Sequence, residues 1–268
     1  MSNTNRTGNL SIDSDNIFPI IKKWLYSDHD IFIRELVSNG CDAITKLKKL
    51  EIMGEYTFPE DYKASIQVIV NPEEKTMKFI DTGLGMTADE VEEYKTNADE
   101  MIGHFGLGFY SAFMVADEVH IDTLSYRDGA TAVHWECDGG TQYTIGDGSK
   151  TTVGTEITLY LNEESVEFAN EYRTREVLDK YCSFMPVEIF LSKANAEPEY
   201  ETIEESELRD DDVVIEHIHE DAKTEEKENE NGEKEIVEVS PAKEMVKIQK
   251  RPVALNDIHP LWTKHPNE

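Results

Sequence analysis

Residues 31–46 constrain the fold most, because they read as one helix with two chemically different sides. At 3.6 residues per turn, the polar residues recur at i, i+4, i+7 and i+11 and form one stripe: Glu35, Asn39, Asp42 and Lys46. The opposite side is apolar and carries Ile33, Leu36, Val37, Ile44 and Leu47. Such a helix suits the outer layer of a globular domain, with the polar stripe simply solvated. A second interpretation is a site, because mid-helix Asn is unfavourable and Glu beside Asn offers a base next to a neutral oxygen ligand.

The charge and the cysteines limit the classes of protein that fit. The 268 residues carry a formal net charge of -30, which argues against nucleic acid or an anionic membrane surface as the main partner. Three cysteines, Cys41, Cys137 and Cys182, lie far apart without CxxC spacing, so we expect buried thiols in a reducing compartment. No signal-peptide core and no apolar run of membrane-spanning length occurs, and we therefore expect a cytoplasmic protein.

The remaining elements follow from periodicity and turn residues. Apolar residues at helical spacing predict a helix at 17–25, and Thr87-Ala88-Asp89-Glu90 is a capping box that begins another. A buried helix at 109–116 and a helix at 173–184 complete the set. Strands are predicted at 65–70, 76–81, 118–125, 131–137, 142–145, 154–161 and 186–191, the first two as a hairpin.

Composition changes sharply after residue 196. Residues 197–239 contain nineteen acidic and four basic side chains, half of the net charge of the chain. Such a segment has little to bury, so we predict a folded region at 1–196, an acidic disordered linker at 197–243 and a short tail at 244–268. So short a tail after a linker suggests a fragment of a longer protein. His217-x-His219 could bind a metal weakly, but a solvated linker is the simpler interpretation.

Three glycine motifs accompany the helix. Asp81-x-Gly-x-Gly ends a strand with a carboxylate that can accept from an exocyclic amine, beside glycines that let a flat ring approach. Gly103-x-x-Gly-x-Gly opens a helix, where backbone N–H groups favour a phosphate. Thr155, in Gly154-Thr155-Glu156, adds a hydroxyl. Each motif alone is most often a tight turn or a strand exit, but together they predict an adenine nucleotide site without a GxxxxGK[ST] loop.

The order of ELVSNGCDA, DTGLGM, IGHFGLGFYSAFMVADEV and GTEITLYL resembles the ATP-binding domain of bacterial-type ninety-kilodalton heat-shock chaperones. The wider fold family includes DNA gyrase, mismatch-repair ATPases and histidine kinases. The resemblance implies a two-layer α/β sandwich of the Bergerat type, with a mixed, largely antiparallel sheet and helices on one face. PLWTKHPNE at 260–268 resembles the start of the family's middle domain.

The resemblance also implies roles for individual residues. Glu35 would be the general base, Asn39 the Mg²⁺ ligand, Asp81 the adenine anchor and Thr155 its supporting hydroxyl. The pocket and the phosphate loop would be lined by Asp42, Lys46, Gly85, Met86, Gly106, Leu107, Gly108 and Phe109. The expected ligands are ATP or ADP with Mg²⁺. The expected partners are unfolded or partly folded client proteins and a middle domain, with no nucleic acid or membrane, and the isolated domain is expected to be a monomer.

This sequence departs from the family pattern in two places that bear on activity. The long ATP lid that precedes the glycine-rich loop is reduced here to KTNADE at 95–100. The middle domain, which supplies an arginine to the γ-phosphate, and the dimerisation domain are absent from this chain. We therefore expect an ATP-dependent chaperone domain that hydrolyses ATP slowly. The alternatives are a non-catalytic fragment that binds nucleotide or protein partners without turnover, and another ATPase of the same fold family, of the gyrase, mismatch-repair or histidine-kinase type.

Overall fold

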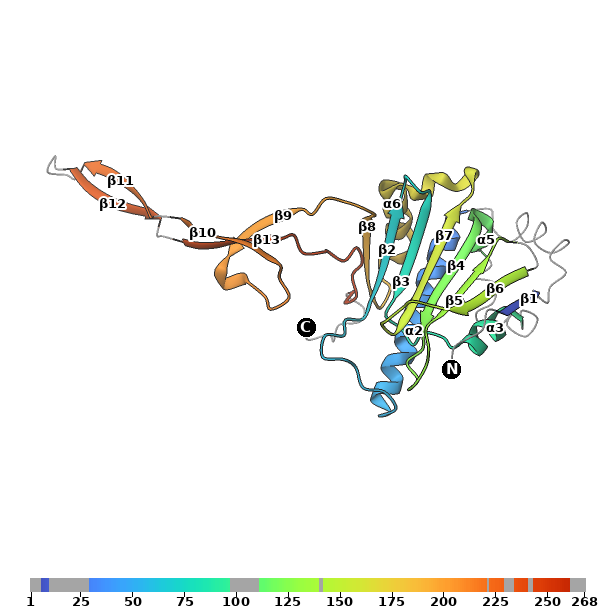
Figure 1. The fold of residues 1–268 in the computed structure, drawn as a ribbon. Coiled ribbons are helices and arrows are strands. Elements are labelled where there is room, and N and C mark those ends of the chain that lie inside the picture. The colour runs from blue at the N-terminus through green and yellow to red at the C-terminus, as the bar shows by residue number, and fades with distance from the viewer. Residues whose placement is uncertain are drawn as a thin grey trace. The chain divides into compact units, whose positions relative to one another are not determined.

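The computed structural model describes residues 6–9, 29–96, 111–139, 142–220, 222–228, 234–240 and 243–260. The chain divides into two units (Figure 1): Met1–Asn195 with Ala254–Glu268, and Ala196–Val253. The predicted helix at 17–25, the glycine-rich loop at 103–108 and the tail beyond residue 260 lie outside the described ranges.

An eight-stranded sheet is the framework of the first unit (Figure 1). Its strand order is β1-β6-β5-β4-β7-β3-β2-β8, and every neighbouring pair is antiparallel except β2 and β8, which run parallel. The strands are β1 (Arg6–Asn9), β2 (Ser65–Asn71), β3 (Thr76–Asp81), β4 (Ala116–Leu124), β5 (Val133–Cys137), β6 (Gln142–Asp147), β7 (Gly154–Leu161) and β8 (Glu188–Lys193). The predicted mixed, largely antiparallel sheet is confirmed, and the β2–β3 hairpin forms as expected.

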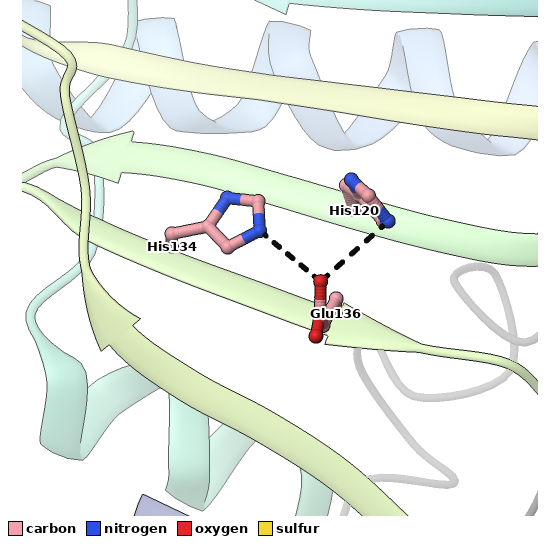
Figure 2. A group of neighbouring side chains, drawn as sticks. All are labelled: His120, His134 and Glu136. Carbon is pink, nitrogen blue, oxygen red and sulfur yellow. Dashed lines mark ion pairs between the residues drawn. The ribbon is translucent and has the colours of Figure 1, made fainter. Parts of the chain in front are cut away.

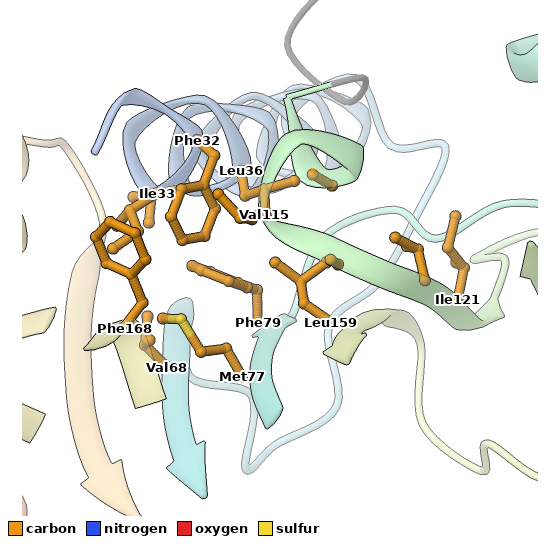
Figure 3. Close-up of a cluster of buried hydrophobic side chains, with 14 of the residues drawn as sticks. Phe32, Ile33, Leu36, Val68, Met77, Phe79, Val115, Ile121, Leu159 and Phe168 are labelled. Carbon is orange, nitrogen blue, oxygen red and sulfur yellow. The ribbon is translucent and has the colours of Figure 1, made fainter. Parts of the chain in front are cut away.

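The helix that carries the polar stripe, α2 (Ile31–Ile52), packs its apolar side onto this sheet (Figure 3). All five predicted apolar residues are buried: Ile33, Leu36, Val37, Ile44 and Leu47. Phe32 joins them, with its ring edge-on to Phe168 at 5.0 Å and to Phe79 at 6.4 Å between centroids. Each buried side chain of this size contributes about 1.5–3 kcal/mol, so the core fixes which side of α2 remains available for chemistry.

A second helix holds the start of α2 through ion pairs. Asp30, at the start of α2, makes no side-chain cap; its buried carboxylate pairs instead with Arg173 and, at 3.6 Å, with Lys180. Both partners lie on α6 (Glu171–Cys182), which corresponds to the helix predicted at 173–184. Packed near the sheet are also α5 (Ala112–Val115) and the short 3-10 helix η2 (Glu163–Ala169).

The predicted capping box is confirmed at α3 (Ala88–Thr96). The Thr87 N–H donates to Glu90 Oε2 at 2.8 Å, and the Glu90 N–H donates to Thr87 Oγ1 at 3.3 Å. Two backbone donors that the first helical turn would leave unpaired are thereby satisfied.

The second unit differs from the disordered linker that the composition predicts for 197–243. It contains a three-stranded antiparallel sheet of order β10-β13-β9, and a separate pair of strands, β11 and β12. The strands are β9 (Tyr200–Glu204), β10 (Val214–Glu220), β11 (Lys223–Glu228), β12 (Lys234–Ser240) and β13 (Lys243–Gln249). A short 3-10 helix, η3 (Glu205–Glu207), follows β9.

Strands form in this acidic segment because its apolar residues alternate and its charges pair across strands, which the average composition does not show. On β13 the apolar residues alternate, and Val246 and Ile248 are fully buried. Opposite charges also meet across the strands, as in Lys243 to Glu204 at 2.6 Å. Apolar alternation and paired charges therefore favour strands in a segment whose composition resembles a disordered one.

The predicted tail at 244–268 is divided between the two units. Residues from Ala254 onward belong to the first unit, where the Leu255 N–H donates to Ile189 O at 2.8 Å. The Asn256 side chain donates to Met185 O and Val187 O and accepts from the Ile189 N–H, each at 2.8 Å. Within the described ranges, no helix has the length and apolar character needed to cross a membrane.

Candidate functional site

A cavity of about 280 Å³ lies between α2 and the sheet. Seven predicted site residues line it: Asn39, Asp42, Lys46, Asp81, Gly85, Met86 and Thr155. Residues from α2, from the ends of β3 and β7 and from the turn after β3 therefore meet in one place. Gly106, Leu107, Gly108 and Phe109 lie outside the described residues.

Only part of the polar stripe of α2 faces the cavity. Asn39, Asp42 and Lys46 line the cavity, whereas Glu35 is not among the lining residues. The Glu35 carboxylate instead forms an ion pair with Arg34 at 2.9 Å. An amide oxygen and a carboxylate at the cavity wall are suitable ligands for Mg²⁺, which prefers oxygen.

The Asp81 carboxyl is the principal acidic group of the cavity on the sheet side. Its Oδ1 accepts from the Gly83 N–H at 2.8 Å, and the Thr155 backbone also hydrogen-bonds to it. Burial raises the pKa of Asp81 to about 7, although those two hydrogen bonds and the charge of Lys150 oppose the rise. Near neutral pH this carboxyl is therefore poised to accept a hydrogen bond, and a donor ligand would favour its ionised form.

The two glycines after Asp81 are required by packing against neighbouring elements. A Cβ at Gly83 would lie 2.5 Å from Ala43 Cβ on α2. Gly85 has a φ of +62°, and a Cβ there would lie 1.9 Å from the carbonyl oxygen of Leu124 on β4. The sequence predicted glycines that admit a flat ring. The structure adds a different reason, because larger residues would separate this turn from α2 and β4.

Thr155 belongs to a hydroxyl network that includes Thr123, which the sequence analysis missed. Thr123 Oγ1 accepts from the Met86 N–H at 2.9 Å, donates to Gly154 O at 3.2 Å and lies 3.1 Å from Thr155 Oγ1. Since the Thr123 proton is used on Gly154, the Thr155 hydroxyl donates to Thr123. The lone pairs of Thr155 Oγ1 are left as acceptors at the cavity wall.

Sequence reasoning also missed most of the apolar lining of the cavity. These residues are Leu36, Ile66, Phe79, Leu84, Ile121 and Ile157, with the small residues Gly40 and Ala43 on α2. At Gly40, a Cβ would lie 3.0 Å from Ile66 Cδ1, so α2 approaches the sheet closely there. The alternation of buried residues on the strands and the small pair on α2 were the available signals. Glu90 of the capping box is a further lining residue that was not predicted.

The geometry describes a predominantly apolar cavity with a few convergent polar groups, as is typical of a small-molecule site. All three cysteines lie elsewhere in the core, as expected, and burial raises the pKa of Cys41 and of Cys182 to about 12. Such thiols stay protonated and unreactive at neutral pH.

Comparison with known proteins gives a consistent result. A family model described as Hsp90 protein matches residues 167–268. The chaperone protein HtpG of Bacteroides thetaiotaomicron is 43% identical over 223 residues, which cover 77% of this chain and 32% of that protein. HtpG of Porphyromonas gingivalis W83 is 43% identical over 204 residues, covering 70% of this chain and 30% of that protein. The chain thus spans about a third of the length of the curated relatives it matches.

Proposed function

The chain belongs to the Hsp90 family, and on this premise we propose that it is the nucleotide-binding domain of an ATP-dependent chaperone. In this proposal the cavity binds ATP or ADP with Mg²⁺, and hydrolysis is slow. Client proteins would be unfolded or partly folded chains, as the chaperone names of the relatives suggest.

The observation that best supports the proposal is the Asp81 carboxyl at the wall of an apolar cavity. Adenine combines a flat apolar face with an exocyclic amine, so it matches a cavity that Ile66, Phe79 and Ile157 line together with the Asp81 carboxyl. Thr155 Oγ1 presents a second acceptor nearby. A hydrogen bond to a charged group of this kind contributes about 1.5–3 kcal/mol.

The α2 side of the cavity supports the phosphate and metal part of the proposal. Asn39 and Asp42 present oxygen atoms that fit Mg²⁺, and Lys46 adds a cation for phosphate. The loop at Gly106–Phe109 is expected to supply backbone N–H groups to the phosphates. Bound Mg²⁺ would neutralise charge on the phosphates.

Glu35 is proposed as the base that activates water, which requires a change at its carboxylate. That carboxylate is held by Arg34 at 2.9 Å and must turn away from this partner to reach a water beside the γ-phosphate. The same ion pair favours a second candidate function, a domain that binds nucleotide without turning it over. Arg34 is nearly half exposed, so the pair is weak enough to exchange.

Calorimetry with ADP and Mg²⁺ tests the proposed adenine contact. Asp81→Asn is expected to weaken ADP binding roughly ten- to hundredfold, because the amide loses the charge that strengthens the hydrogen bond. Asp117→Asn, at an exposed position on β4, is the matched control and should bind as the wild type does. Equal ADP affinity in Asp81→Asn and the wild type would overturn the assignment.

A further inference from the structure

The polar face of strands β4 and β5 carries a cluster of nitrogen and oxygen donors. Val119, Ile121 and Trp135 point into the core, so the residues between them point to the other face of the sheet. The outward residues are Glu118, His120 and Asp122 on β4, and His134 and Glu136 on β5. Antiparallel pairing places His120 opposite Glu136 and Asp122 opposite His134.

Three of these side chains converge (Figure 2). Glu136 Oε2 lies 3.6 Å from His134 Nε2 and 3.9 Å from His120 Nε2, and the three donor atoms lie within 4.8 Å of one another. Both nitrogen–oxygen distances are too long for good hydrogen bonds. In tetrahedral Zn²⁺ sites with bonds of about 2.1 Å, neighbouring donors are about 3.4 Å apart. Shifts of about 0.5 Å or less would bring Glu136 to that spacing from each histidine.

A neighbouring carboxylate already orients one histidine for metal binding. His134 Nδ1 lies 2.9 Å from Asp122 Oδ1, and since the carboxylate accepts, Nδ1 carries the proton. Nε2 of the neutral ring then presents its lone pair toward Glu136. A carboxylate that holds the distal N–H of a metal-binding histidine is the usual supporting arrangement in zinc proteins.

We propose that His120, His134 and Glu136 bind a divalent transition metal of the zinc class on the face of the sheet. Two imidazoles and a carboxylate are ligands that Zn²⁺ prefers, whereas Mg²⁺ and Ca²⁺ select oxygen alone. This site is separate from the proposed nucleotide site, whose lining residues include none of these three. It does not depend on the proposed function.

Glu118 is the natural fourth ligand. Its Oε1 lies 2.7 Å from His120 Nε2, which therefore donates to it before a metal binds. When the metal occupies Nε2, the ring proton resides on Nδ1 and the Glu118 carboxylate is released to face the ion. Glu118 and Glu136 together would balance the two positive charges of the metal. The nearby cation Lys78 pairs with Glu156 at 2.6 Å, so its charge is partly neutralised.

Titration of Zn²⁺ alone into the tag-free, chelator-treated chain, without nucleotide, measures this site. The wild type is expected to bind one equivalent that is lost, or weakened at least tenfold, in His120→Ala and in His134→Ala. Glu136→Gln keeps the side-chain shape and should also weaken binding. Asp122→Asn removes only the supporting carboxylate and is expected to weaken binding roughly 10–100-fold.

The double variant His217→Ala/His219→Ala is the matched control, because it removes two other histidines from β10. It is expected to bind Zn²⁺ as the wild type does. Co²⁺ reports the donor set: the visible bands of a four-coordinate nitrogen and oxygen site should appear in the wild type and in this control, and disappear in His134→Ala. Unchanged Zn²⁺ affinity in His120→Ala and His134→Ala, loss in the control, or a cobalt–thiolate band would each overturn the proposal.

Discussion

The Asp81 carboxyl is the proposed contact for adenine, and because it is buried its ionisation lowers the stability of the folded chain. Its position at a strand end before two glycines was readable from the sequence, whereas its role as the adenine anchor stays a prediction. The displaced pKa was not readable, because it depends on burial by residues distant in sequence, such as Ile66 and Thr155. The same limit explains why Thr123 was missed, since its role comes from contacts with Met86 and Gly154 on other segments.

Asp81→Asn is expected to stabilise the chain without nucleotide while it weakens ADP binding. The folded pKa of about 7 lies above the unfolded value near 3.9, so wild-type stability is fully present below about pH 4 and falls as pH rises through 7. The full loss, reached above pH 7, is on the order of 4 kcal/mol, and the amide avoids it. Thermal melts at pH 5 and pH 8 should show a stabilising difference that grows with pH, whereas Asp117→Asn tracks the wild type. A constant difference at the two pH values would contradict the buried, ionised carboxylate.

The helices and strands with strong apolar periodicity were predicted from the sequence. The strands within residues 197–243 were not, because that prediction relied on average composition. The apolar side of α2 and the capping box of α3 follow from local spacing, which the structure preserves. The strands of Ala196–Val253 differ because long-range pairing decides them. Arg251 illustrates this: it donates to both oxygens of Asp212, a residue 39 positions earlier, and to Glu207 O at 2.8 Å.

Arg251→Ala is expected to loosen the second unit and leave ADP binding unchanged. The Arg251 guanidinium holds the pKa of Asp212 at about 2, well below its usual range. The Asp212 side chain is 3% exposed, so removal of the guanidinium leaves a buried carboxylate without its ion-pair partner. Limited proteolysis should then cut within residues 196–253 faster than in the wild type. Lys250→Ala, which removes an exposed pair with Glu199, is the control and should be cut at the wild-type rate. Weaker ADP binding in Arg251→Ala would show that this unit contributes to the nucleotide site.

For the whole molecule, the family could be inferred from the order of motifs, and the relatives support that inference. The family resemblance also predicted the two-layer fold and its mixed sheet. In the structure, the cavity lies between this sheet and α2. The rate of ATP hydrolysis does not follow from the fold, because it depends on groups that must assemble around the γ-phosphate. In this chain, Glu35 is paired with Arg34 and lies outside the cavity lining.

The chain is accordingly expected to bind ATP and hydrolyse it very slowly. A cationic finger aimed at the γ-phosphate contributes roughly 10³–10⁵ in rate, and the family resemblance assigns that arginine to a middle domain. Steady-state phosphate release by the wild type should be close to that of Glu35→Ala. Addition of a middle domain in trans should raise the rate of the wild type but not that of Glu35→Ala. Brisk release by the isolated wild type, lost in Glu35→Ala, would show that a cation within this chain completes the site.

The proposed adenine contact with Asp81 places the base in the cavity between α2 and the sheet. A crystal structure of the chain with ADP and Mg²⁺ would show this contact in full. The predicted result places the adenine ring between Ile66, Phe79 and Ile157, with its exocyclic amine about 3 Å from an Asp81 carboxylate oxygen. Nucleotide bound outside this cavity, or with its amine turned away from Asp81, would rule out the proposed contact.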